Sequence, residues 1–135
     1  MSNNKQIVET RNLESIRYLD LCDSANWVDL VISSGEQEQL TITGPANLVG
    51  RIRTRLENDT LIIRLGGTLV DKIQDALTTS LSRKKITYHL TVKQLEGIEL
   101  WGLIRLDTSG LMSGNPVIRH LNPWAIPIRG PIPFK

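Results

Sequence analysis

The sharpest candidate for chemistry in this sequence is a set of basic residues at alternating positions. Arg51, Arg53 and Arg55 fall on one side of an extended segment, Arg64 lies in the next segment, and Lys84 follows later. Guanidinium and ammonium groups gathered on one face can bind phosphates or anionic glycans. Arginines on a strand also protect sheet edges and keep a surface soluble. These five residues are therefore the candidate anion-binding face, and a solubilising surface is the alternative.

The acidic residues do not form a pattern typical of a metal or catalytic site. Asp20, Asp23 and Asp29 lie close together in the sequence. A calcium loop needs several oxygen ligands at tight spacing and a glycine for the turn, and no such run is present. We therefore expect these three carboxylates to be solvated at strand ends.

The histidines and the cysteine are equally sparse. His89 and His120 are the only histidines, and Cys22 is the only cysteine. These numbers exclude an internal disulfide and a cysteine-based zinc cluster. No helix N-terminus or basic neighbour of Cys22 in the sequence would lower its pKa, so we expect an unreactive thiol. His89 falls opposite the aliphatic face of its segment and is expected to be exposed. We predict no cofactor, no metal and no catalytic residue.

Three tryptophans, Trp27, Trp101 and Trp124, could mark a carbohydrate or protein contact. Tryptophan is commonly well buried, so we expect Trp27 in the core. Trp101 and Trp124 are the more open candidates. Together with Ile126, Ile128 and Phe134 they form the predicted self-association surface.

Composition limits the remaining classes. The 135 residues suit one domain, and 40% hydrophobic residues can fill a core. Only 4% are aromatic, so the core must be aliphatic and a base-stacking platform is not expected. A net charge of +2 is too small to indicate nucleic-acid binding. No apolar run approaches the ~20 residues of a membrane span. The polar N-terminus lacks the apolar core of a signal peptide, which as written predicts a cytoplasmic chain.

The candidate residues named above are positioned by short runs in which apolar and polar residues alternate. The runs cover residues 16–21, 28–32, 40–43, 51–56, 60–65 and 86–92, and several end at Gly, Pro, Asn or Asp. This pattern is typical of strands, and their close spacing leaves no room for crossover helices. The sequence therefore predicts an all-β domain over residues 1–111, either a sandwich, a barrel or a solenoid.

Two segments depart from the alternation. Apolar residues recur at helical spacing from Leu69 to Leu81, which predicts one inserted helix. Residues 112–135 hold five of the six prolines, yet they are also apolar. Since proline gives no ladder donor, this segment cannot be a central strand. We expect an extended arm that lies against its own body or against a neighbouring copy.

The order of these segments resembles the bacterial auto-transporter adhesin family, also called the head GIN domain. The similar motifs are Asn12-Leu13-Glu14-Ser15-Ile16, Trp27 to Gly35, Leu40 to Gly44, Asn47-Leu48, Asn58 to Ile63, Ile86 to Val92 and Leu95 to Leu100. The resemblance covers about residues 7–110, and the order of the motifs carries it. The sequence departs from the family pattern at three places: the prolines after Gly110, Trp101 where a small residue is expected, and the long predicted helix.

The resemblance implies a β-helix, a solenoid of parallel strands filled by aliphatic ladders, at the cell surface or envelope. It implies no cofactor and no catalytic residue. We therefore expect a non-enzymatic structural or adhesion-like module that forms homo-oligomers, because a solenoid that stops early needs a cap. The alternatives are a binding module for an anionic glycan or nucleic acid, and a polysaccharide-acting β-helix enzyme.

Overall fold

The computed structural model describes residues 5–67, 73, 84–112 and 116–121. The predicted helix falls almost wholly outside these residues, and the predicted arm lies outside them beyond residue 121. Among the described residues, no helix has the length and apolar character needed to cross a bilayer.

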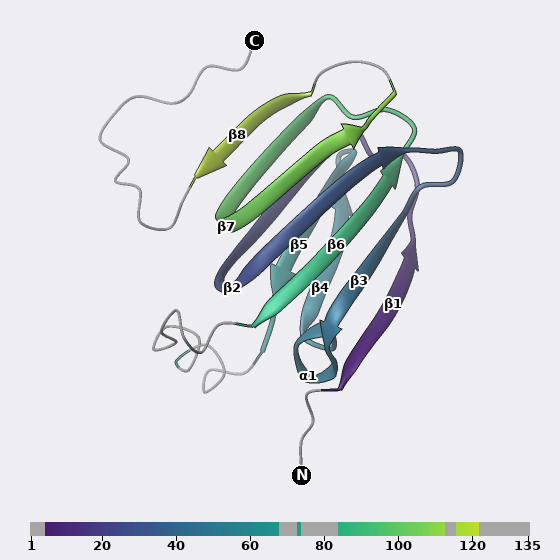
Figure 1. Cartoon of the computed structure of the whole chain (residues 1–135). Helices are drawn as coiled ribbons and strands as arrows, with labels where there is room; N and C mark the ends of the chain where they lie inside the picture. Colours follow the sequence, from purple (N-terminus) through teal and green to yellow (C-terminus); the bar gives the residue numbers. More distant parts are fainter. Residues whose placement is uncertain (1–4, 68–72, 74–83, 113–115, 122–135) are drawn as a thin grey trace.

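The described residues form mostly strands, as the alternating pattern predicted (Figure 1). In order the elements are β1 (Gln6–Asn12), β2 (Tyr18–Ser34), β3 (Gln39–Pro45), α1 (Ala46–Val49), β4 (Ile52–Glu57), β5 (Thr60–Leu65), β6 (Lys85–Val92), β7 (Gly97–Gly110) and β8 (Val117–Leu121). Strand β8 falls in the segment that was predicted to be an extended arm.

All eight strands belong to one sheet, with the long strand β2 at its centre. The first part of β2 pairs in parallel with β5, and its second part pairs in parallel with β6. Strand β7 runs parallel to β2 along both parts, and β8 pairs in parallel with β7. The remaining strands, β4, β3 and β1, are added antiparallel at the edges. The sandwich alternative required two separate sheets and is wrong.

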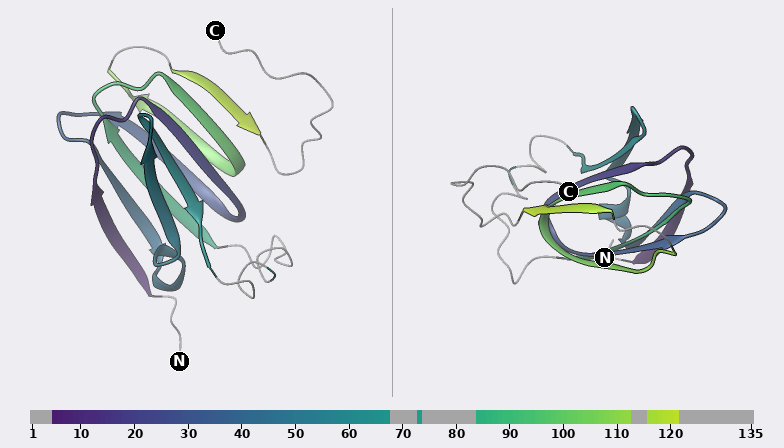
Figure 2. Two further views of the ribbon diagram at one scale, coloured as in Figure 1. Left: turned by 180° about the vertical axis from the view of Figure 1, so that it is seen from behind. Right: turned by 90° about the horizontal axis from the view of Figure 1, so that it is seen from above.

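The sheet curls around one aliphatic core (Figure 2). Side chains alternate across each strand, so that Ile86, Tyr88, Leu90 and Val92 of β6 are buried while His89 points outward. The two parts of β2 contribute to the same core. Within the part of the chain that the structure describes, Tyr88 is the only aromatic residue among the buried side chains.

The curl begins at a bend that β2 and β7 share. Residues 24–26 of β2 have no partner in the register, which passes from Asp23 opposite Gly102 to Trp27 opposite Leu103. The buried carboxylate of Asp23 accepts hydrogen bonds from the backbone N–H groups of Ala25 (2.9 Å) and Asn26 (3.1 Å) and from the Asn26 amide. Asp23 is therefore a structural residue of the bend, and the expectation of a solvated carboxylate was wrong.

Side-chain contacts tie separate parts of the curled sheet together. Between the two edge strands, Arg11 of β1 donates from Nη1 to Oγ1 of Thr54 in β4, 3.2 Å away. Buried Glu38, in the β2–β3 connection, accepts the backbone N–H groups of Ile16 and Lys93, which joins it to the β1–β2 and β6–β7 connections. A carboxylate that accepts hydrogen bonds from buried backbone N–H groups stabilises the fold, so we assign Glu38 a structural role.

Candidate functional site

The sheet brings three of the five predicted basic residues together. Arg53 and Arg55 are exposed on the outer face of β4, and Arg53 lies opposite Arg64 of β5. Arg51 is half-buried and donates from Nε to the carbonyl oxygen of Gly66, 2.8 Å away. Lys84 is exposed, but it lies in the other half of the curl, where its carbonyl accepts the backbone N–H of Trp27.

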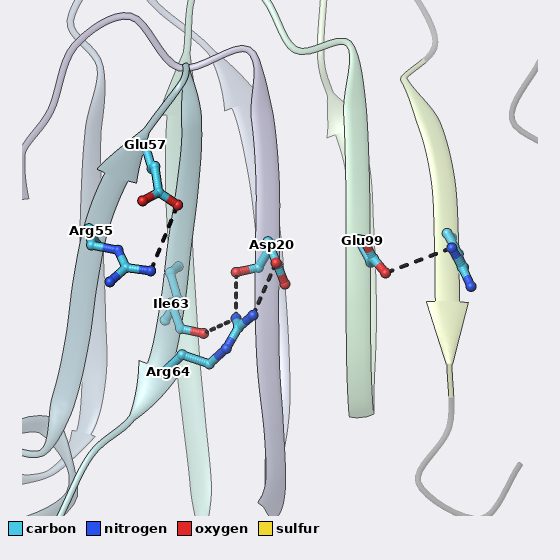
Figure 3. A network of polar contacts seen from close by, with 7 residues as sticks. Asp20, Arg55, Glu57, Ile63, Arg64 and Glu99 are labelled. Atoms are coloured by element: carbon cyan, nitrogen blue, oxygen red, sulfur yellow. Dashed lines mark hydrogen bonds and ion pairs between the residues drawn. The ribbon is translucent and has the colours of Figure 1, made fainter.

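Carboxylates balance most of this charge (Figure 3). Arg64 donates to the Asp20 carboxylate at 3.0 Å and to the Asp20 carbonyl at 3.1 Å. The hydrogen bond to Asp20 raises the pKa of Arg64. Arg55 lies 3.8 Å from Glu57, and β7 adds the carboxylate of Glu99 to the same face. Because acids and bases alternate across the strands, an anion-binding face at the five basic residues stays a prediction.

A shallow cavity of about 570 Å³ lies beside this charged face. Gly97 and Tyr18 line it, and a Cβ added at Gly97 would lie 3.0 Å from the Tyr18 ring. Glu96 and Glu99 also line it. The Glu96 carboxylate binds the guanidinium of Arg17, which raises the pKa of Arg17. The carboxylates make this cavity a poor site for an anion.

A second cavity, of about 520 Å³, lies on the outer face just after the shared bend. We call it the Trp27 cavity, since Trp27 contributes the largest side chain to its lining. Trp27 is 43% exposed, which corrects the expectation that it would be a core residue. The reason is strand parity: Val28 points into the core, so its neighbour must point outward.

Three strands place a charged triad in the Trp27 cavity. Asp29 of β2 lies between Lys85 of β6, whose Nζ is 2.8 Å from Oδ2, and Arg105 of β7, whose Nε is 3.2 Å from Oδ1. The hydrogen bond from Lys85, with that from Arg105, lowers the pKa of the Asp29 carboxyl below 3.8. The triad holds two cations and one carboxylate, so it carries one excess positive charge. Asp29 therefore lies within a strand and is ion-paired, which differs from the predicted solvated strand end.

The cysteine and the two histidines, for which no reactive role was predicted, lie apart from the Trp27 cavity. Burial raises the pKa of the Cys22 thiol, although Arg64 opposes this shift. The ring Nε2 of His89 lies 3.1 Å from Oγ of Ser33, and that of His120 donates to the carbonyl of Gly102 at 3.2 Å. Within the described part of the chain, no group of three or more His, Cys, Asp or Glu residues could hold a metal ion.

The predicted self-association residues are only partly covered by the structure. Trp101 is half-buried on the outer face of β7, where it lies between Cys22 of β2 and Leu121 of β8 in the register. Trp124, Ile126, Ile128 and Phe134 lie outside the described residues. Their proposed role stays a prediction.

Comparison with known families decides the assignment. A family described as "Putative auto-transporter adhesin, head GIN domain" matches residues 21–120. The chain belongs to this family. The head GIN assignment covers β2 from Leu21 onward and all of β7, and thus the bend and the Trp27 cavity. Among curated proteins, no match is found.

Solved structures with the same fold are also described as adhesins. A putative adhesin from Bacteroides fragilis is 20% identical, with a TM-score of 0.61, and the match covers 87% of this chain and 51% of that one. A putative adhesin from Parabacteroides merdae is 13% identical, with a TM-score of 0.66, and the match covers 87% and 45%. A putative lipid binding protein from Parabacteroides distasonis is 15% identical, with a TM-score of 0.56 and coverage of 77% and 41%. This head GIN chain spans about half the length of these structures.

Sequence reasoning missed the residues of the Trp27 cavity as a group. A signal was present for Trp27 and Asp29, because both alternate with the buried residues Val28 and Leu30. No local signal could place Lys85 and Arg105 beside them. These two residues lie on β6 and β7, far from β2 in the sequence, and meet Trp27 and Asp29 only through the register of the sheet.

Proposed function

We propose that this chain is a non-enzymatic, adhesion-like module that associates with itself through the end of its sheet formed by β8. The family match and the adhesin descriptions of its structural neighbours support adhesion at a cell surface or envelope. The half-buried or buried carboxylates of Asp23, Glu38 and Asp29 are committed to backbone donors or ion pairs. This favours a structural or binding role over hydrolysis.

The pairing of the strands supports a short solenoid. Strands β5 and β6 lie in parallel against the first and second parts of β2, and β7 repeats the course of β2 on its other side. Strand β8 then begins the same course beside β7. The parallel layers thus stack in the order β5 and β6, β2, β7 and β8, with the first full passage, β2, inside the stack as a rung is in a solenoid.

The observation that carries the proposal is an aliphatic ladder with an open end. One inward-facing row runs across five strands: Leu56, Leu61, Leu19, Ile98 and Ile118. Its three middle members are buried, whereas Ile118 in β8 is 41% exposed. Leu56 at the other end of the row is equally exposed, but it lies on β4, which is antiparallel to its neighbour. Ile118 lies on β8, which is parallel to β7, so the β8 end is where a further layer would continue the stack.

A second copy of the chain is the occupant that we propose for this end. Two β8 ends that meet about a twofold axis would continue both ladders with identical aliphatic side chains. The predicted surface at Trp101, Trp124, Ile126, Ile128 and Phe134 would belong to the same contact.

Light scattering after size exclusion tests the proposal with a matched pair of variants. Ile118→Lys places a charge at the β8 end, and Leu56→Lys places one at the opposite end of the same ladder, where the exposure is also 41%. We expect the wild type and Leu56→Lys to exceed the 15.2 kDa mass of one chain. We expect Ile118→Lys to weaken association by about tenfold or more, since a twofold contact counts the change twice.

Two results would overturn the proposal. One is a wild-type mass of one chain throughout the micromolar range. The other is equal loss of association in both variants, which would indicate head-to-tail stacking or unfolding. A deletion of residues 122–135 tests the predicted surface separately, and unchanged association in this variant would remove that segment from the contact.

A further inference from the structure

We propose that the Trp27 cavity binds an acidic saccharide, with the sugar ring against Trp27 and its carboxylate on Arg105. This inference rests on the proposed adhesion-like function and names the ligand class. It uses a surface separate from β8, so the two proposals can fail independently.

The apolar half of the site comes from Trp27. Its side chain is 43% exposed in a cavity of about 520 Å³, within the range of small-molecule sites. The half-buried Leu103 lies opposite Trp27 in the register and extends the apolar lining. A flat indole surface with a polar surround fits the C–H face of a pyranose ring.

The charged half of the site selects for an anion. Arg105 is 79% exposed and uses Nε for Asp29, which leaves its terminal amino groups without a protein partner among the described residues. A guanidinium binds a carboxylate through two parallel hydrogen bonds. Asp29 fixes the direction of Arg105 and, with its remaining lone pairs, can accept a sugar hydroxyl. Lys85 supplies the second cation.

The surroundings favour a saccharide over a nucleic acid. Bases of a single strand need successive aromatic platforms, whereas Trp27 is the only aromatic side chain among the described residues that line this cavity. On the neighbouring half of the outer face, Asp20 and Glu99 already pair with Arg64 and Arg119, so these two arginines are neutralised and do not extend the cationic site for a long phosphate backbone. The site is therefore suited to one or a few acidic sugar units.

The test compares trigalacturonic acid with its fully methyl-esterified form in the intact chain. Binding is followed by NMR at the indole N–H signal of Trp27, which Trp27→Phe identifies. We expect the acid to bind about tenfold more tightly than the ester. Arg105→Gln and Lys85→Gln should each remove the preference for the acid, because each removes a cation that faces the saccharide carboxylate. Both side chains are exposed, so the substitutions leave the core intact.

Arg55→Gln is the matched control. Arg55 is also an exposed, ion-paired arginine, but it lies in the other half of the curl, so binding should stay within about twofold of the wild type. Equal binding of acid and ester, or no shift at the Trp27 signal, would overturn the inference. Displacement by inorganic phosphate at the same concentration would also overturn it, since it would show a simple anion site. Light scattering on the same samples shows whether self-association is retained, so loss of saccharide binding alone leaves the proposed function standing.

Discussion

Replacement of Gly102 by alanine should disrupt the bend on which the curl depends. Gly102 lies opposite Asp23, where β7 crosses the three extra residues of β2. Its φ is +135°, a conformation that residues with a side chain rarely adopt. A Cβ at this position would lie 2.0 Å from the carbonyl oxygen of Asp23 and 2.9 Å from its carbonyl carbon. Since both atoms are backbone, the strands themselves would have to separate.

Two effects set the size of the loss. A left-handed or otherwise sparsely populated conformation costs about 1–3 kcal/mol for a residue with a side chain. Forcing extra volume into a packed contact costs about 1–3 kcal/mol more. We therefore expect Gly102→Ala to lower the free energy of unfolding by about 2–6 kcal/mol, out of the 5–15 kcal/mol typical of a domain.

Equilibrium unfolding in urea, followed by far-UV circular dichroism, measures this change. Gly50→Ala is the control, because Gly50 has an ordinary φ of −65° and the nearest atom to an added Cβ is 3.5 Å away. The control should be neutral or gain up to about 1 kcal/mol from the less flexible unfolded chain. A Gly102→Ala variant within about 1 kcal/mol of the wild type would refute the reasoning.

Three further predictions follow from buried groups. Asp23→Ala leaves the backbone donors of Ala25 and Asn26 without their acceptor and should lower the free energy of unfolding by about 2 kcal/mol or more in the same urea assay. Asp107→Ala removes a similar but exposed contact and should lower it by less than about 1 kcal/mol. Equal losses in the two variants would contradict the role of burial. Burial raises the pKa of Tyr88 above 10.0, so above this pH the unfolded chain loses a proton that the folded chain keeps, and stability should fall by up to about 1.4 kcal/mol per pH unit. In Tyr88→Phe, the decrease in the free energy of unfolding between pH 10 and 11 should be smaller by the contribution of Tyr88. An identical pH dependence in both proteins would contradict this role of Tyr88. Because burial raises the pKa of Cys22, alkylation by iodoacetamide at pH 8 should be about tenfold slower in the folded chain than in urea, and equal rates would show an accessible thiolate.

Local patterning explains why so much of the fold could be predicted. In β6, the apolar residues Ile86, Tyr88, Leu90 and Val92 are spaced so that only one face can enter a core, and the structure buries all four. The turn at Asn58 and Asp59 was also visible, since both residues accept the positive φ that a tight hairpin requires. Such features depend on neighbours in the sequence and need no knowledge of distant partners.

The candidate site could not be predicted because its parts meet through long-range pairing. Asp29, Lys85 and Arg105 come from β2, β6 and β7, and only the parallel register aligns them. The expectation for Trp27 failed for a different reason: the general tendency of tryptophan to be buried was given more weight than the alternation of its own strand. Here strand parity was the stronger constraint, because reversing Trp27 would have expelled Val28 from the core.

The bend at Asp23 links the fold to the proposed binding site. The residues that follow it in β2 and β7, Trp27 and Leu103, are the first outward positions after the register resumes, and they line the Trp27 cavity. Any loss of the bend would therefore move the indole of Trp27 relative to Arg105, which lies two residues after Leu103 in β7. This coupling makes variants at Asp23 or Gly102 unsuitable as probes of ligand binding. Exposed positions such as Arg105 and Lys85 can instead change the charge of the cavity while the bend, and with it the position of Trp27, stays the same.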